Sequence, residues 1–156
     1  MTLFPGRRRA VLRTLAALAP ILSIGAAPAG GTLRIEVGNV RGDKGRVHVD
    51  ICTQAQFLKD CPIASDAPAR TGVTVVTVAG LPPGRYAAQV FYDENANGKV
   101  DRALFGIPKE GVGFSNDAKI RWSPPKWDEA VFAFDGQDST IHLKLRYFIG
   151  PDAPHS

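Results

Sequence analysis

The sequence predicts an all-β fold, a single antiparallel β-sandwich. Apolar and polar residues alternate in several runs, and Val, Ile, Tyr and Phe are frequent at the apolar positions. A period of two with these residues indicates strands that bury one face. No stretch of ten or more residues has a helical period, and turns rich in Gly and Pro separate the runs. Six or seven short strands of this kind are typical of two packed sheets with Greek-key connections.

Each strand is expected where the alternation is clearest. The third run contains a change of face, because Val73 and Val75 are followed by Val76 and Val78. Residues 41–45 are expected to join the first two strands as a hairpin, and Pro82-Pro83-Gly84 to turn the chain before the fourth. The expected strands are 33–37, 47–51, 73–78, 86–92, 130–134 and 141–147.

A long segment rich in Gly, Pro and aromatic residues, 102–128, follows the fourth run. We expect it to pack over one end of the sandwich as an ordered loop, because its large apolar side chains would otherwise be exposed. Residues 30–149 are expected to form the single domain, and residues 150–156 a disordered tail. The apolar side chains in question are Phe105, Ile107, Phe114, Trp122 and Trp127.

Residues 1–29 have the pattern of a signal peptide. Four arginines precede an uncharged apolar stretch, 14–27, and Ala27-Pro28-Ala29 offers small residues for cleavage. We therefore expect an exported protein, periplasmic or secreted. The Arg8-Arg9 pair resembles a twin-arginine signal, so both that route and the general Sec route stay open. A retained membrane anchor is the alternative, although the apolar stretch is short and Pro20 interrupts it.

The net charge of +4 comes from the leader. The chain has 19 basic and 15 acidic residues, and four of the basic ones precede residue 30. The remainder is balanced at fifteen of each and shows no basic stripe, so no nucleic-acid partner is expected. We also expect no transmembrane segment after the leader.

Cys52 and Cys61 are the two cysteines of the chain. A close pair in an oxidising compartment typically forms a structural disulfide. The spacing differs from that of a redox pair, which normally encloses two residues.

Asp93-Glu94-Asn95-Ala96-Asn97-Gly98-Lys99-Val100-Asp101 is the strongest candidate site. Oxygen-bearing side chains occupy positions 1, 3, 5 and 9, and glycine occupies position 6, as in loops that wrap a hard cation. We predict a weak Ca²⁺ site, because the bidentate glutamate expected at position 12 is replaced by Leu104. The predicted ligands are Asp93, Asn95, Asn97, the backbone carbonyl of Lys99, Asp101 and, as candidates to complete the shell, Glu110 or Glu94.

An alternative for the same nine residues is a polar turn without any ion. Asn-Gly and Asx hydrogen bonds stabilise such turns by themselves. The sequence leaves both interpretations open.

Other candidate sites are weaker, and we predict no catalytic residue. His48 and His142 alternate with apolar neighbours and are expected on outward faces, and nothing places a histidine beside Ser115. Trp122 and Trp127 are candidate ligand-binding residues that would stack on a sugar, although tryptophans of this kind more often plug a core.

Three blocks occur in order along the chain: Leu81-Pro82-Pro83-Gly84-x-Tyr86-Ala87, the loop at 93–101, and Gly106-Ile107-Pro108-x-Glu110-Gly111-x-Gly113-Phe114-Ser115-Asn116. Together with the stretch from Pro124 to Phe132, they resemble a bacterial family of exported proteins, the domain-of-unknown-function family numbered 2141. The resemblance spans about residues 33–147 and implies a small exported β-sandwich with no assigned activity. The first block also looks like the turn and strand of transthyretin-like and collagen-adhesin B-type sandwiches, which supports a transthyretin- or immunoglobulin-like fold and not a function.

The sequence thus favours a non-enzymatic binding or envelope-associated module, with an unknown protein or glycan partner. A calcium-dependent carbohydrate- or surface-recognition module is the alternative. A hydrolase is a further, weaker alternative.

Overall fold

The computed structural model describes residues 30–150. The predicted signal peptide, residues 1–29, lies outside them, as does the tail beyond residue 150. Within residues 30–150, no helix is long and apolar enough to cross a membrane.

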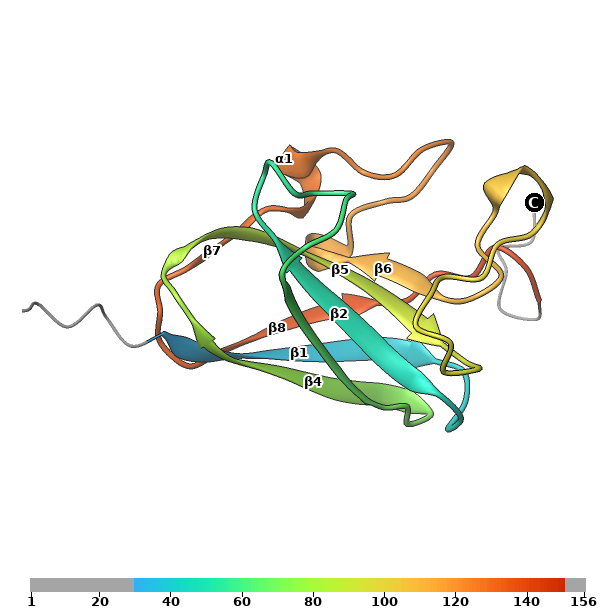
Figure 1. Ribbon diagram of the computed structural model, residues 1–156, viewed down its shortest axis with the longest axis horizontal. Coiled ribbons are helices and arrows are strands. Elements are labelled where there is room, and N and C mark those ends of the chain that lie inside the picture. Colours follow the sequence, from blue (N-terminus) through green and yellow to red (C-terminus); the bar gives the residue numbers. More distant parts are fainter. Residues whose placement is uncertain (1–29, 151–156) are drawn as a thin grey trace, which may run out of the picture.

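The fold is all-β, and its strands form two sheets. The first sheet has the order β4-β1-β8, with β1 at Gly31–Val40, β4 at Gly72–Leu81 and β8 at Ser139–Lys144. The second has the order β3-β2-β5-β6, and β7 also pairs with β5. Figure 1 shows β2 crossing obliquely in front of β1 and β4. The second sheet comprises β2 (Arg46–Cys52), β3 (Ile63–Pro68), β5 (Gly84–Asp93), β6 (Val112–Phe114) and β7 (Phe132–Phe134).

One pairing departs from the antiparallel expectation. β1 and β8 run parallel, with Leu33 opposite Ser139 and Gly38 opposite Lys144. Parallel neighbours require a long crossover between them, and here nearly the whole domain separates the two strands. A pattern of alternation indicates a strand but carries no information on the direction of its neighbour.

The predicted hairpin at residues 41–45 is wrong. β1 pairs with β4 and β8, whereas β2 pairs with β3 and β5, so this turn carries the chain from one sheet to the other. Gly45 has φ +74, and a Cβ there would lie 2.0 Å from the backbone oxygen of Asp93. The close approach fixes the start of β2 against the end of β5.

The predicted change of face in the third run is also wrong. Thr74, Val76 and Val78 all point inward along β4, with exposed fractions of 1%, 0% and 5%. The Thr74 hydroxyl donates to the carbonyl oxygen of Arg70 (3.1 Å) and accepts from its N–H (2.9 Å). The hydroxyl of this inward-facing threonine thus finds its hydrogen-bond partners nearby. A sequence reading that assigns only apolar residues to the buried face therefore places Val73 and Val75 on the wrong side of β4.

Buried side chains from both sheets share one core. Tyr92 and Tyr147 are its largest fully buried members, and Leu33, Ile35, Val47, Val49, Leu143 and Leu145 are each 2% exposed or less. A second, smaller cluster unites Phe57, Ala87, Ala118 and Ala130, with Phe114 and Trp127 packed against it. The predicted disulfide joins Cys52 to Cys61.

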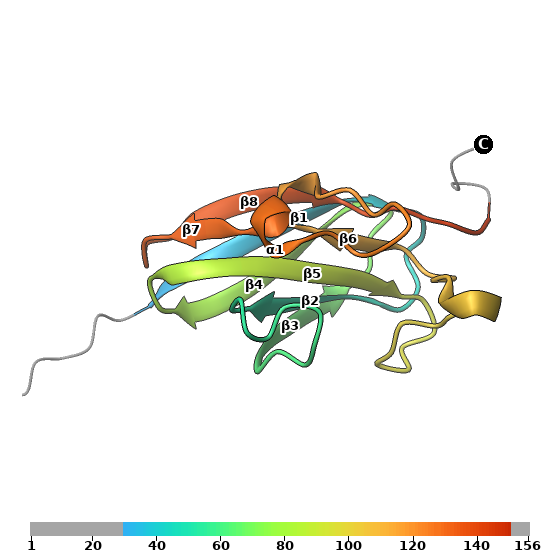
Figure 2. The same ribbon diagram turned by 90° about the horizontal axis from the view of Figure 1, so that it is seen from above.

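The segment 102–128 is ordered and packs as expected in part, because Phe114 and Trp127 lie against the smaller cluster. It contains η1 (Leu104–Gly106), β6, η2 (Ser115–Asp117) and the start of α1 (Trp127–Ala130). Phe105 and Trp122 are fully exposed and Ile107 is 42% exposed, against the expectation that these side chains would be covered. Figure 2 shows η1 projecting at the end of the molecule opposite to the start of β1.

Candidate functional site

The predicted oxygen-rich loop, residues 93–101, follows β5 and is held by the carboxylate of Asp93. This side chain is buried, and it accepts hydrogen bonds from the backbone N–H of Asn97 (3.0 Å) and Gly98 (2.7 Å). Gly98 has φ +75 and Ala96 has φ +57, so the chain turns sharply beneath the carboxylate. We call residues 93–101 the Asp93 loop.

Two asparagines bridge the Asp93 loop to its last residue. The Asn95 side-chain oxygen accepts from the Asn97 N–H (3.1 Å), and that of Asn97 from the Lys99 N–H (2.8 Å). Their amide nitrogens donate to the two carboxylate oxygens of Asp101, at 2.8 Å and 3.1 Å. Three of the predicted ligand side chains therefore meet at one point of the loop.

Glu110 closes the loop from outside. Its carboxylate accepts the N–H of Glu94 (3.0 Å) on one oxygen and the N–H of Asp101 (2.9 Å) on the other. Glu110 is 4% exposed. Burial raises the pKa of its carboxyl, and the nearby charges of Asp101 and Asp93 act in the same direction, while the two backbone hydrogen bonds oppose them.

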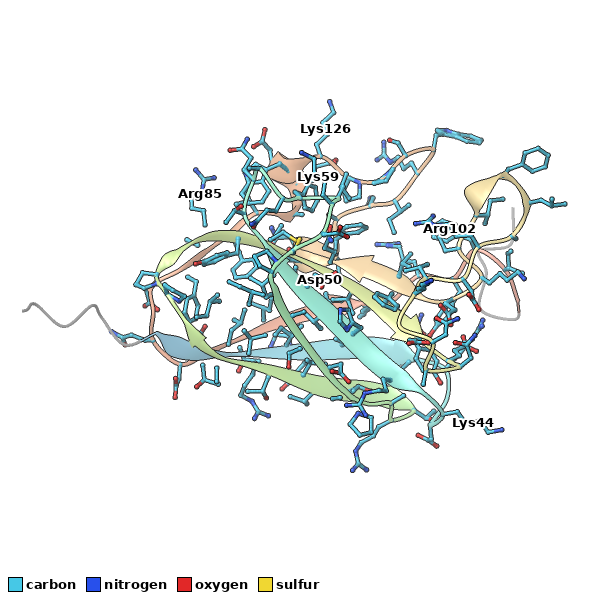
Figure 3. The ribbon with its side chains drawn as sticks, viewed as in Figure 1. Lys44, Asp50, Lys59, Arg85, Arg102 and Lys126 are labelled. Atoms are coloured by element: carbon cyan, nitrogen blue, oxygen red, sulfur yellow. A yellow bond between two sulfur atoms is a disulfide. The ribbon has the colours of Figure 1, made fainter. Side chains whose placement is uncertain are left out.

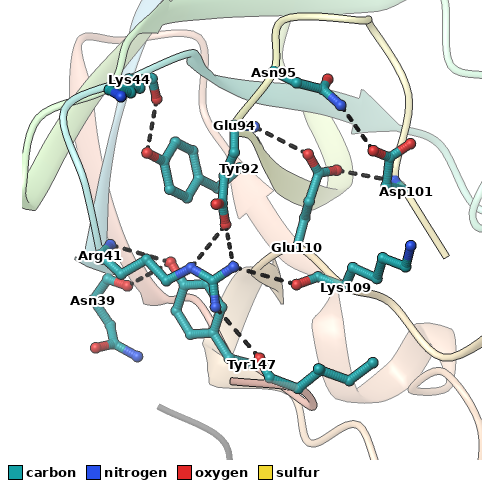
Figure 4. A network of polar contacts seen from close by, with 11 residues as sticks. Asn39, Arg41, Lys44, Tyr92, Glu94, Asn95, Asp101, Lys109, Glu110 and Tyr147 are labelled. Atoms are coloured by element: carbon teal, nitrogen blue, oxygen red, sulfur yellow. Dashed lines mark hydrogen bonds and ion pairs between the residues drawn. The ribbon is translucent and has the colours of Figure 1, made fainter. Parts of the chain in front are cut away.

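A cation and two tyrosines anchor the loop to the rest of the fold (Figure 4). The Arg41 guanidinium donates to the Glu94 carboxylate (2.8 Å) and lies 4.5 Å from the centre of the Tyr147 ring. The Tyr147 hydroxyl donates to the Asn39 carbonyl (3.0 Å), and burial raises its pKa to about 12. The Tyr92 hydroxyl donates to the Lys44 carbonyl (2.7 Å).

This geometry fits a cation only in part. Asn95 and Asn97 meet Asp101 through their amide nitrogens, and their side-chain oxygens accept backbone N–H groups, as the carboxylates of Asp93 and Glu110 do. A cation held by these three side chains would require both amides to turn their oxygens toward Asp101. Residues 30–150 contain no group of three or more His, Cys, Asp or Glu side chains arranged to hold a metal. Each carboxylate or amide oxygen keeps a free lone pair, so these oxygens are compatible with a weakly bound cation.

A groove of about 430 Å³ lies on the outer face of the second sheet. Its floor is formed by outward residues of β5 and β6, among them Phe91 and Phe114. One wall is the disulfide-closed turn at Leu58–Asp60, and the others are Arg102 with Pro108 and Ile120 with Pro124. We call this cavity the outer groove. Figure 3 labels Lys59 and Arg102, which line it from two separate loops.

His48 stands beside the outer groove, in a concavity that shares Asp50, Phe91 and Arg102 with it. Its Nε2 lies 3.1 Å from the Asp50 carboxylate, and its ring centre 4.9 Å from that of Phe91. The hydrogen bond to Asp50 raises the pKa of His48, and burial opposes the shift. His48 faces outward as predicted but is half-buried, while His142 is exposed.

The two tryptophans have different environments. Trp127 is half-buried, and its ring lies edge-on to Phe57 with centres 5.7 Å apart, so it belongs to the smaller core cluster. Trp122 projects fully into solvent. The Ser115 hydroxyl is buried between the Ala130 carbonyl, to which it donates, and the Ala88 N–H, from which it accepts. Its contacts are those of a residue that ties α1 to β5.

Sequence reasoning identified the Asp93 loop and Glu110 but missed their anchors. Arg41 lies in a glycine-containing turn with no motif of its own, and Glu94 lies 53 positions further along the chain. Tyr147 continues an alternating run and is expected only as core. The outer groove was likewise not anticipated, because it is assembled from segments that lie far apart in the chain, from Asp50 to Pro124.

The fold and site define a small all-β protein with a hydrogen-bonded, carboxylate-rich loop at one end of its second sheet. The chain belongs to the family described as an uncharacterized protein conserved in bacteria, DUF2141, whose model matches residues 35–142. Comparison with curated proteins and with solved structures gave no match.

Proposed function

We propose that this protein is an exported, non-enzymatic β-sandwich with Greek-key connections that binds a partly apolar ligand in the outer groove, as a module of the cell envelope. The observation that carries the proposal is the groove itself, with an aromatic floor and charged groups of both signs around it, the cations Lys59 and Arg102 and the carboxylates Asp50 and Asp60. Ligand sites are concave, mostly apolar and furnished with a few polar groups. The leader-like residues 1–29 and the disulfide support export, to the periplasm or beyond the cell, by either the Sec or the twin-arginine route.

The anionic aromatic dye anilinonaphthalene sulfonate tests the groove, because its rings suit the aromatic floor and its sulfonate can pair with Lys59 or Arg102. We expect dye fluorescence to rise on binding, and the rise to be lost in Phe91→Ser. Phe91 lies on the outer face of β5, so the change spares the core. Val73→Ser removes a 53% exposed apolar side chain from the other sheet and serves as the matched control. An equal rise in the parent protein and in Phe91→Ser would contradict the proposal.

We further propose that Ca²⁺ binds weakly to the Asp93 loop and stabilises it. Asp101 would supply a carboxylate, and Asn95, Asn97, the Lys99 carbonyl, Asp93 and Glu110 the remaining oxygens. Ion binding has to compete with the existing hydrogen bonds to Asp101. For a dissociation constant of about 10⁻⁴–10⁻³ M, 10 mM Ca²⁺ raises the free energy of unfolding by roughly 1.4–2.7 kcal/mol.

Thermal unfolding with and without 10 mM Ca²⁺, roughly tenfold or more above that dissociation constant, tests this. Asp101→Asn should abolish the stabilisation, and Asp60→Asn, an exposed carboxylate of the 53–61 turn, should leave it intact. Unchanged unfolding and unchanged proteolysis of the loop in the parent protein would remove calcium from the proposal and leave the polar turn as the structure of the loop.

A calcium-dependent carbohydrate- or surface-recognition module is a second candidate. The observation in its favour is the full exposure of Trp122 on a segment that borders the outer groove through Ile120 and Pro124. Trp127 contributes to the core cluster and is not proposed as a stacking platform. Glycan-array binding that requires Ca²⁺ and is lost in Trp122→Ser would support this candidate, and its absence would count against it.

A hydrolase remains the least supported candidate, because Ser115 is 1% exposed and both roles of its hydroxyl are occupied. We propose no catalytic residue.

A further inference from the structure

Two loop tips that border the outer groove carry the three most exposed large apolar side chains of residues 30–150. On the first tip, Leu104 is 82% exposed, Phe105 97% and Ile107 42%. On the second tip, Trp122 is fully exposed. Arg102 and Pro108 of the first loop and Ile120 and Pro124 of the second line the same groove, so the two loops are neighbours. Exposed large apolar side chains gathered in this way mark an interaction site.

The first tip projects from the protein and is held in shape by hydrogen bonds within its loop. The Lys109 N–H donates to the Asp101 carbonyl (2.8 Å) and the Ala103 N–H to the Ile107 carbonyl (2.7 Å), so the two arms of the loop are cross-linked. The Arg102 guanidinium donates to the Gly106 carbonyl (2.9 Å). Phe105 has φ +64, a left-handed conformation that is uncommon for an aromatic residue. This backbone holds Leu104 and Phe105 away from the core.

Positive charge is concentrated on the same two loops. Segments 102–109 and 119–126 read Arg-Ala-Leu-Phe-Gly-Ile-Pro-Lys and Lys-Ile-Arg-Trp-Ser-Pro-Pro-Lys. They hold five of the fifteen basic residues that follow residue 29 and none of the fifteen acidic ones. The protein beyond the leader is neutral in total, so the positive charge of these two tips is set against a negative remainder. The acids that directly flank the first segment, Asp101 and Glu110, accept hydrogen bonds within the Asp93 loop, and Asp117 and Asp128 lie two residues from the ends of the second.

We propose that the two loop tips dock the protein on an anionic lipid surface, with Leu104, Phe105 and Trp122 entering the headgroup region and Arg102, Lys109, Lys119 and Arg121 contacting lipid phosphates. Aromatic and apolar side chains beside Lys and Arg are the combination that places protein segments in the membrane interface. Phosphate neutralisation alone, as in nucleic-acid binding, gives no role to the fully exposed Leu104 and Phe105. This inference deepens the proposed envelope role by naming its partner, and it rests on that role.

The test uses purified protein with phosphatidylcholine vesicles, with and without one-third phosphatidylglycerol. We expect flotation with the anionic vesicles, weakened by salt, and a shift of tryptophan emission to shorter wavelength. The Leu104→Ser/Phe105→Ser double variant should bind about 100-fold or more weakly, because each of the two apolar side chains buried in lipid is worth roughly 1.5 kcal/mol or more. Val73→Ser, which removes a 53% exposed apolar side chain from β4, should bind like the parent protein.

Charge is tested separately. Lys109→Glu and Arg121→Glu should each weaken binding to the anionic vesicles by about fivefold or more, from roughly 1 kcal/mol for each cation near the surface. Arg85→Glu, at the opposite end of β5 from Arg102 (Figure 3), should change binding by less than about twofold at physiological salt, since the screening length is about 8 Å.

Trp122→Phe keeps an aromatic side chain at the tip and leaves the half-buried Trp127 as the remaining tryptophan. It therefore shows which tryptophan gives the emission shift. It should still float with the vesicles but lose the emission shift. A shift that persists in Trp122→Phe, or binding that is unaffected by the Leu104/Phe105 change, would overturn the proposal. So would concentration-dependent self-association through the tips without any vesicle binding. Dye binding in the groove without vesicle binding would remove this inference and leave the proposed function in place.

Discussion

At the scale of single residues, the Asp93 loop depends on carboxylates that serve the backbone. Asp93 and Glu110 together accept four backbone N–H groups, from Asn97, Gly98, Glu94 and Asp101. Such groups are donors that need partners once buried. The spacing that resembles a cation loop is therefore also a spacing that folds the loop without a cation.

Gly45 is the residue where we expect the largest effect from the smallest change. Gly45→Ala places a Cβ 2.0 Å from the Asp93 backbone oxygen and adds the strain of φ +74. Gly72→Ala, with φ +89 and nothing within 4 Å of the new Cβ, isolates the strain alone. We expect Gly72→Ala to cost about 1–2 kcal/mol and Gly45→Ala to cost clearly more in urea unfolding. Equal losses would show that β2 and β5 are not held together at this point.

His48 should make stability depend on pH. Its folded pKa is raised above 6.5 by the Asp50 hydrogen bond. The folded state therefore binds the proton more tightly than the unfolded chain, so this contribution is complete below about pH 6.5 and is lost as pH rises through the folded pKa. We expect the melting temperature to fall between about pH 6 and 8 and the fall to shrink in His48→Gln. His142→Gln, an exposed histidine on β8, is the control, and an NMR titration of His48 below 6.5 would contradict the assignment.

At the scale of elements, periodicity predicted strand existence well and strand pairing poorly. β1, β2, β5 and β8 were found from alternation, whereas β3 and β6 were not predicted. β3 (Ile63–Pro68) contains small and polar residues at its outward positions, and β6 has three residues. Both receive their strand conformation from neighbours already in place, a tertiary effect with little local signal. The parallel β1–β8 pair and the sheet-changing turn at 41–45 are likewise decided by packing.

The 53–61 turn, which forms one wall of the outer groove, is held by the disulfide. Replacing both Cys52 and Cys61 by Ala removes a link that closes a loop of about ten residues, and the chain-entropy estimate gives a loss of about 2.5–3 kcal/mol. Because Leu58, Lys59 and Asp60 lie inside this loop, we also expect weaker binding of the anionic dye. Urea unfolding with and without a reductant checks the first effect. Insensitivity to the reductant would mean that the turn is held by other contacts, such as the Gln89 hydrogen bonds to Leu58 and Lys59.

At the scale of the whole molecule, the net charge did not predict how the charged residues are distributed over the surface. The balance of fifteen basic and fifteen acidic residues argued against a charged surface, yet five cations lie on two neighbouring loops. Their adjacency follows from the way β6 and η2 bring residues 119–126 back beside residues 102–109. Likewise, the expectation that Phe105 and Trp122 would be covered assumed that large apolar residues serve the core, which fails where a loop is built to project.

The single core that joins the two sheets predicts one cooperative unfolding transition. Leu143 lies on β8 of the first sheet and is 2% exposed, whereas Trp127 reports from the outer side of the second sheet. Leu143→Ala should lower the free energy of unfolding by about 2–5 kcal/mol, and the transitions seen by Trp127 fluorescence in a Trp122→Phe background and by far-UV circular dichroism should move together. Lys144→Ala, the exposed neighbour on the same strand, should change stability by less than about 0.5 kcal/mol. Separate transitions for the two probes would mean that the sheets unfold independently. The second sheet and its loops would then stay folded without the first sheet.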